Sequence, residues 1–210
     1  MNKLSFEIRE LDGEFDGGIK IPSITTFKTT PDSKVQKLYT NILNDKNAIY
    51  YSFVNSVEQI EHIFDESGIE HDNITVKQID GFKDISADDM SEETQIVFIE
   101  SFEVLEDIQN EYTDRYKYLD KIFTGIYELS TEYNVAVLLD ISKNASQSNA
   151  HDYTYRVSDN ILELEYEYSG KTIDTYLTIL KSRLHTTETK RLKLEIEGYD
   201  IKVDTTREIA

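Results

Sequence analysis

The stretch QIVFIES, at residues 95–101, is a nearly unbroken apolar run that ends in Glu100 and a serine. Such a run is typical of a central strand in a parallel sheet, because that strand is buried on both faces. A second run of this kind, VAVLLD, occupies residues 135–140. Between the two, apolar residues recur at helical spacing from Leu105 to Leu129. Strand, helix and strand in this order predict a parallel sheet with a crossover helix.

The same alternation extends toward the N-terminus. Apolar runs and helical spacing predict three short strands and two helices, namely strands at residues 24–27, 48–53 and 74–79 and helices at 35–43 and 56–64. Ser56 stands at the N-cap position of the second helix, with Glu58 and Gln59 in its first turn. Residues 81–94 are polar and acidic, which predicts a loop or a mobile excursion, with solvated charges at Asp88 and Asp89.

The C-terminal third has a different pattern. Residues 143–155 are rich in Ser, Asn and Gln, and we expect a polar loop there. Apolar residues then alternate with polar ones in the segments 161–166, 176–180 and 192–196, as in antiparallel strands. The whole pattern predicts one α/β domain over residues 1–210. Its mostly parallel sheet should be flanked by helices and end in antiparallel strands.

Composition excludes several classes of function. The chain has 41 acidic and 22 basic residues, a formal net charge of -19, which disfavours binding to nucleic acid or to an anionic membrane. The absence of cysteine excludes disulfides and cysteine-held metal centres, and the four histidines lack metal-ligand spacing. No apolar run is long enough for a membrane span or a signal peptide, so we expect a cytoplasmic protein. Such acidity also suits a halophile, although 16 lysines against six arginines leave that habitat open.

Several segments, in order, resemble the KaiC-like branch of the RecA-superfamily ATPases. The matching segments are DGGI at 16–19, IPSIT at 21–25, the strand at 96–101, VSDNILEL at 157–164 and LKSRLH at 180–185. In that family the IPSIT-like segment leads into the phosphate-loop strand, and a Lys-x-Arg segment corresponds to Lys181 and Arg183. The resemblance spans almost the whole chain and implies a RecA-like α/β fold, in an archaeal or bacterial protein.

The chain departs from this family where the chemistry takes place. A working phosphate loop needs two glycines, a lysine and a hydroxyl residue, whereas residues 28–35 read KTTPDSKV and keep only Lys34. Residues 50–60, YYSFVNSVEQI, place Val54 and Asn55 where family members carry catalytic glutamates. Glu100 falls where the resemblance places the magnesium-orienting acid. Lys34 and Glu100 are therefore the candidates for a vestigial nucleotide site, although each is also compatible with an ordinary polar residue.

These departures favour a non-catalytic protein, a pseudo-ATPase that acts as a regulatory, scaffolding or signalling subunit through contacts with other proteins. The resemblance implies a homo-oligomer or a mixed oligomer with an active RecA/KaiC-like ATPase. In such an oligomer, Lys181 and Arg183 could act as a trans finger, a basic segment that reaches the nucleotide of a neighbouring subunit. The alternative is that they are a pair of exposed bases. We expect no obligatory cofactor, with ATP and Mg²⁺ as vestigial ligands. A weak ATP-binding switch remains the alternative function.

Overall fold

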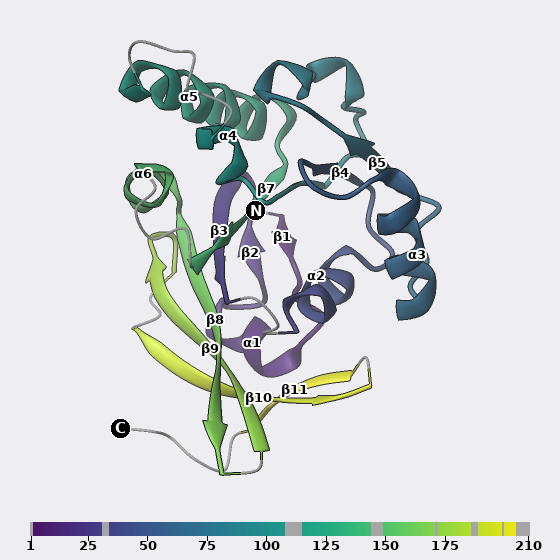
Figure 1. The fold of residues 1–210 in the computed structure, drawn as a ribbon, viewed down its shortest axis with the longest axis vertical. Helices are drawn as coiled ribbons and strands as arrows, with labels where there is room; N and C mark the ends of the chain where they lie inside the picture. The colour runs from purple at the N-terminus through teal and green to yellow at the C-terminus, as the bar shows by residue number, and fades with distance from the viewer. Residues whose placement is uncertain are drawn as a thin grey trace.

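The computed structural model describes residues 2–30, 34–107, 115–143, 149–170, 172–185, 189–198 and 200–204. Within these residues, nine strands form one sheet in the order β11-β10-β9-β8-β3-β7-β6-β4-β5, with helices on both faces (Figure 1). A small second sheet pairs β1 (Lys3–Leu4) with β2 (Ile19–Lys20). The α/β fold predicted from the sequence is confirmed.

Six strands make the parallel part of the large sheet: β5 (Ile74–Gln78), β4 (Ala48–Ser52), β6 (Ile96–Glu100), β7 (Ala136–Ser142), β3 (Ser23–Thr29) and β8 (Asn160–Ser169). The QIVFIES stretch supplies β6, which lies between β7 and β4 and is buried along its whole length. Burial on both faces explains why this strand shows no polar alternation in its sequence.

The antiparallel part contains β9 (Thr172–Ser182), β10 (Lys190–Glu197) and β11 (Asp200–Asp204). The strand predicted at residues 161–166 belongs to both parts, because β8 pairs in parallel with β3 and antiparallel with β9. Its alternating pattern therefore identified a strand correctly, but not the direction of both its neighbours.

Two hydrophobic cores lie on opposite faces of the sheet. One packs against α1 (Arg9–Glu14), α2 (Val35–Leu43) and α3 (Val57–Ser67). The other packs against α4 (Val104–Asp107), α5 (Arg115–Tyr133) and α6 (Asn149–Val157). Successive residues of a strand point to opposite faces, so Phe98 contributes to the first core and Ile99 to the second.

The segment predicted as a polar loop at residues 143–155 is helical in its second half, where α6 begins at Asn149. Tertiary packing explains the difference, since the ring of Tyr153 stacks on Phe123 of α5 with centroids 5.7 Å apart. Residues 144–148 lie outside the described part of the chain, as does the stretch 108–114 within the predicted long helix.

The acidic excursion at residues 81–94 contains two short 3-10 helices, η1 (Phe82–Asp84) and η2 (Ala87–Asp89). Asp89 is not a solvated loop charge as the sequence suggested. Its carboxylate accepts a 2.7 Å hydrogen bond from the Tyr51 hydroxyl and pairs with Lys77. These contacts fasten the excursion to β4 and β5.

The N-cap predicted at Ser56 is confirmed, and it is part of a capping box. The Ser56 hydroxyl accepts a hydrogen bond from the Gln59 amide, and the Gln59 side chain accepts one from the Ser56 amide.

We expect Ser56→Ala to lower the free energy of unfolding by about 1 kcal/mol, measured by urea denaturation. Glu61→Ala, on the exposed side of the same helix, is the control and should change it by less than about 0.5 kcal/mol. Equal effects of the two substitutions would argue against the cap.

Candidate functional site

Four neighbouring strands bring polar side chains together at one edge of the sheet. β4 ends at Ser52, β6 at Glu100 and β3 at Thr29, and Asp140 lies near the end of β7. The register sets Ser52 directly opposite Glu100, and Asp140 opposite Phe27. All four side chains point to the face covered by α2 and α3, because they alternate with residues of the other core. Carboxyl edges of this kind are where open α/β sheets bind ligands.

Glu100 is 8% exposed, and the chain's own donors occupy its carboxylate. The Ser52 hydroxyl lies 2.5 Å from Oε2, and the Asn55 side-chain amide lies 3.0 and 3.1 Å from the two oxygens. The Ser52 hydroxyl in turn accepts hydrogen bonds from the backbone amides of Val54 and Asn55. The loop after β4 therefore closes over Glu100 and supplies hydrogen-bond donors to its carboxylate.

Asp140 is the second acid at this edge. Its Oδ1 atom accepts hydrogen bonds from the Thr29 hydroxyl at 3.0 Å and from the Tyr39 hydroxyl at 2.5 Å. The pKa of Asp140 is raised to about 6, because burial and the charge of Glu100 raise it by more than the two hydrogen bonds lower it. The carboxyl group thus changes its charge near neutral pH.

An aromatic layer lies beneath the two acids. The Tyr50 ring stacks on Phe98 with centroids 4.7 Å apart, and the Tyr39 ring meets Phe98 at 4.6 Å and Phe27 at 5.4 Å. Burial is the main reason why the pKa values of both tyrosines lie well above 10; the charge of Asp140 adds to the effect at Tyr39, and that of Glu100 at Tyr50. Both hydroxyls therefore remain protonated and can donate hydrogen bonds to the acids.

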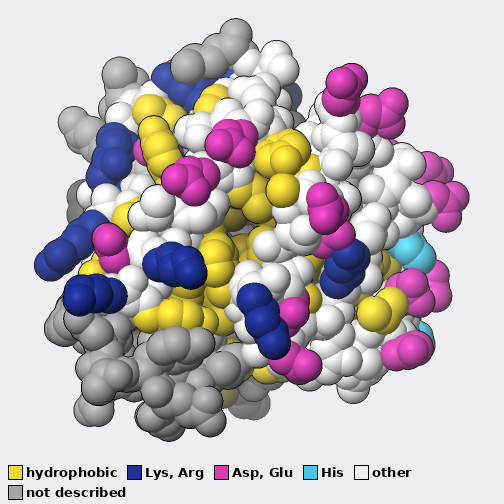
Figure 2. All heavy atoms as spheres, turned by 90° about the horizontal axis from the view of Figure 1, so that it is seen from above, with side chains coloured by type: hydrophobic (Ala, Val, Ile, Leu, Met, Phe, Trp, Pro, Cys, Tyr) yellow, Lys and Arg dark blue, Asp and Glu magenta, His cyan; other side chains and the backbone are white. Residues whose placement is uncertain are grey.

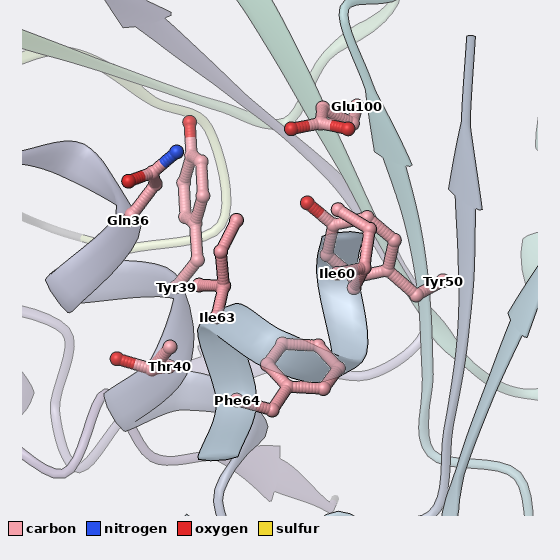
Figure 3. Close-up of a pocket in the computed structure, with 8 residues that line it drawn as sticks. All are labelled: Gln36, Tyr39, Thr40, Tyr50, Ile60, Ile63, Phe64 and Glu100. Atoms are coloured by element: carbon pink, nitrogen blue, oxygen red, sulfur yellow. The ribbon is translucent and has the colours of Figure 1, made fainter. Parts of the chain in front are cut away.

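A small pocket separates α2 from α3 below Glu100. Figure 3 shows the hydroxyl of Tyr50 directed toward Glu100 across this space. The lining residues are Gln36, Tyr39, Thr40, Tyr50, Ile60, Ile63, Phe64 and Glu100. The volume of about 10 Å³ has room for one water molecule. A site for a small organic ligand needs roughly 300 Å³ or more, so this pocket does not accept a nucleotide in the described conformation.

The residues of the degenerate phosphate loop are dispersed. Lys34 is exposed at the start of α2 with a left-handed φ of 57°, and residues 31–33 lie outside the described part. Lys28 is buried in β3, with its ammonium 4.0 Å from the centre of the Tyr155 ring. Val35 packs against the core below α2. Ser52, Glu100, Thr29 and Asp140 form the polar cluster at the carboxyl edge of the sheet. Of the two predicted nucleotide-site residues, Glu100 belongs to this cluster, and Lys34 has no described contact with the cluster.

Lys181 and Arg183 lie together at the end of helix α6. The Lys181 ammonium donates to the carbonyls of Tyr155 and Ser158 at 2.6 Å each, and the Arg183 guanidinium donates to the carbonyl of Arg156 at 2.9 Å. The last carbonyls of a helix lack partners within the helix and attract cations. Both bases therefore cap α6 within their own chain, while the Arg183 side chain remains 51% exposed.

Within the described ranges, no group of three or more His, Asp or Glu side chains is arranged to hold a metal ion. None of the described helices is both long and apolar enough to cross a membrane.

Comparison with known proteins places the sequence in a family. The family profile matches residues 3–210, nearly the entire chain. The chain belongs to DUF7125, a family of unknown function. No curated protein matches the sequence.

Solved structures share the fold of this DUF7125 protein. A KaiC-like protein from the archaeon Pyrococcus horikoshii OT3 superposes with a TM-score of 0.74 at 12% identity, covering 97% of this chain and 99% of the other. The flagellar accessory protein FlaH from Methanocaldococcus jannaschii gives a TM-score of 0.75 at 12% identity, covering 94% and 96%. The RecA/KaiC-like fold implied by the sequence resemblance is thus confirmed.

Sequence reasoning found Glu100 but missed most of its surroundings. The motif position identifies Asn55 only as a missing acid, whereas its side-chain amide donates to both carboxylate oxygens of Glu100. Asp140 was visible as an acid at the end of a buried strand, which is the signal that could have identified it. Nothing in the sequence distinguished Tyr39 and Tyr50 from the other tyrosines.

Proposed function

We propose that this protein is a non-catalytic RecA/KaiC-like module, a pseudo-ATPase that works as a regulatory, scaffolding or signalling subunit in the cytoplasm. One observation carries the proposal: the chain's own donors occupy both acids at the carboxyl edge of the sheet. Asn55 and Ser52 hold Glu100, and Tyr39 and Thr29 hold Asp140. A Mg²⁺ ion would have to displace these donors.

The chemistry needed for hydrolysis is also missing from the described loop after β4. Asn55 is a hydrogen-bond donor to Glu100 and cannot take a proton from water. Loss of a general base alone costs roughly 10²–10⁴ in rate. One charge-assisted contact from Lys34 contributes on the order of 1.5–3 kcal/mol, whereas micromolar binding needs about 8 kcal/mol. Lys34 alone therefore cannot hold a nucleotide.

A steady-state ATPase assay tests this proposal. In high-potassium buffer with Mg²⁺, we expect the wild type to release phosphate no faster than the Lys34→Ala variant. Turnover that depends on Lys34 would contradict the proposal and would support the alternative, a weak ATP-binding switch.

The proposed partners are other proteins, either further copies of this chain or an active RecA/KaiC-like ATPase. Exposed apolar side chains offer contact area, among them Tyr127 on α5 (61% exposed) and Tyr168 on β8 (73% exposed). Figure 2 shows the molecule from above, relative to Figure 1. On this face, hydrophobic side chains gather near the centre, among charged ones. Apolar patches of this kind mark interaction surfaces when they are large enough.

Arg183 could act as a trans finger in such an assembly. Half of its side chain is exposed, so it could leave the Arg156 carbonyl at little cost and reach a neighbouring nucleotide. In a complex with an active ATPase, we expect Arg183→Ala to lower the partner's turnover, by up to roughly 10³-fold. Arg9→Ala, which removes an equal charge from an exposed position of α1, should leave it unchanged. Copurification with an ATPase whose rate does not respond to Arg183→Ala would exclude the finger.

A further inference from the structure

His185 follows strand β9, and its imidazole is completely buried. The ring packs edge-on against Phe15, with centroids 5.1 Å apart. Among the described residues, neither ring nitrogen has a hydrogen-bond partner. The Asp16 carboxylate lies 3.7 Å from Nδ1, which is too long for a hydrogen bond. A buried polar group without partners destabilises the folded chain, and a charged one would do so much more.

The imidazole lies in a seam between two segments far apart in the sequence. On one side are residues 14–20, which lead from the end of α1 into β2. On the other are residues 182–185, at the end of β9, together with Lys190 at the start of β10. The ammonium of Lys20 donates to the carbonyl of Leu184, and Lys190 pairs with Glu14 at 2.7 Å. The Phe15–His185 aromatic pair also joins these two segments.

The charges around the imidazole oppose its protonation. Burial has the largest effect and lowers the pKa of His185, and the positive charges of Lys20 and Lys3 lower it further. Asp16 acts in the opposite direction, but its side chain is 60% exposed at the rim. The folded seam therefore favours the neutral imidazole over the imidazolium. An imidazolium would gain both solvent and an ion pair by moving toward Asp16.

We propose that His185 is an acid-sensitive latch. As the neutral ring it holds residues 182–185 against residues 14–20, and as the imidazolium it leaves Phe15 for Asp16 and opens this contact. The inference goes beyond the proposed function and requires neither nucleotide nor partner. Because the folded pKa lies below the ordinary 6.5, the latch's contribution to stability is complete above pH 6.5. It is lost as the pH falls through the folded pKa.

Histidine NMR provides the first test. The imidazole signal of His185, assigned by its loss in His185→Gln, is followed from pH 8 to pH 4 in the folded chain and in the chain unfolded in urea. We expect the folded chain to show the lower midpoint. A folded midpoint equal to or above the unfolded one would overturn the proposal.

Amide hydrogen exchange tests the opening itself. The Arg183 amide, which donates to the Asp159 carbonyl at 2.7 Å, reports on the seam, and the Ile79 amide, bonded to the Ser52 carbonyl at 2.9 Å, reports on a distant part of the sheet. In the wild type, protection at Arg183 should fall by up to about tenfold per pH unit between pH 6.5 and the folded pKa and then level off, while protection at Ile79 stays constant. In His185→Phe, which keeps an aromatic ring against Phe15, the fall at Arg183 should disappear. An equal fall at both amides, or a fall that persists in His185→Phe, would contradict a local latch.

Discussion

Replacement of Tyr39 by alanine should lower the free energy of unfolding by about 3–5 kcal/mol. The ring lies at the centre of the aromatic layer, in contact with Phe27 and Phe98, and α2 is held to the sheet through it. The substitution leaves a cavity beside this layer and removes the 2.5 Å hydrogen bond to Asp140. Urea denaturation at pH 7 measures the effect.

Tyr39→Phe separates the two contributions. It keeps the ring and removes only the hydroxyl, so we expect a loss of about 1–3 kcal/mol. The loss should be larger at pH 8 than at pH 5, because the hydroxyl donates to a carboxylate whose pKa is about 6. A loss in Tyr39→Ala no greater than in Tyr39→Phe would show that the aromatic layer does not anchor α2.

Asp140→Asn should stabilise the protein at pH 8, by at most about 3 kcal/mol. The folded pKa of Asp140 is raised from 3.8 to about 6, so the folded state binds the proton more tightly than the unfolded chain. The corresponding stability is complete below pH 3.8 and is lost as the pH rises through 6. Asparagine keeps an oxygen acceptor for Thr29 and Tyr39 without the charge. The residue retains some solvent contact, which makes this figure an upper bound.

The comparison of wild type and Asp140→Asn across pH 4–8 tests this account. We expect their unfolding free energies to diverge between pH 4 and pH 7, with the variant more stable at the upper end. Asp88→Asn, which removes an exposed charge from η2, is the control and should differ from wild type by less than about 0.5 kcal/mol at pH 8. Destabilisation by Asp140→Asn at pH 8 would mean that the carboxylate is stabilised by its surroundings.

The sequence predicted the central strands β6 and β7 well because they are buried on both faces and therefore almost uniformly apolar. The prediction of a loop was wrong at α6, where the local pattern is not apolar. This helix is polar in composition and is ordered by contacts of a few side chains, such as Tyr153 against Phe123, which no local pattern reveals. The family resemblance gave the order of the elements, and the structure confirms it.

The site was predictable only in part. Motif positions within single chain segments identified Glu100 and showed that Val54 and Asn55 stand in place of the family's acids. The hydrogen bonds that occupy Glu100 join residues 45 or more positions apart, and those of Asp140 reach across three elements. Their existence depends on strand register and on how α2 lies over the sheet. A sequence can show that a catalytic residue is missing, but not what replaces its contacts.

Calorimetric titration with MgATP and MgADP in high-potassium buffer tests the central claim most directly. With both acids held by internal donors and with Lys34 outside the cluster, we predict no heat of binding for the wild type or for Lys34→Ala at micromolar to millimolar nucleotide. Micromolar binding by the wild type that is lost in Lys34→Ala would contradict this account. It would show that the degenerate loop still binds nucleotide.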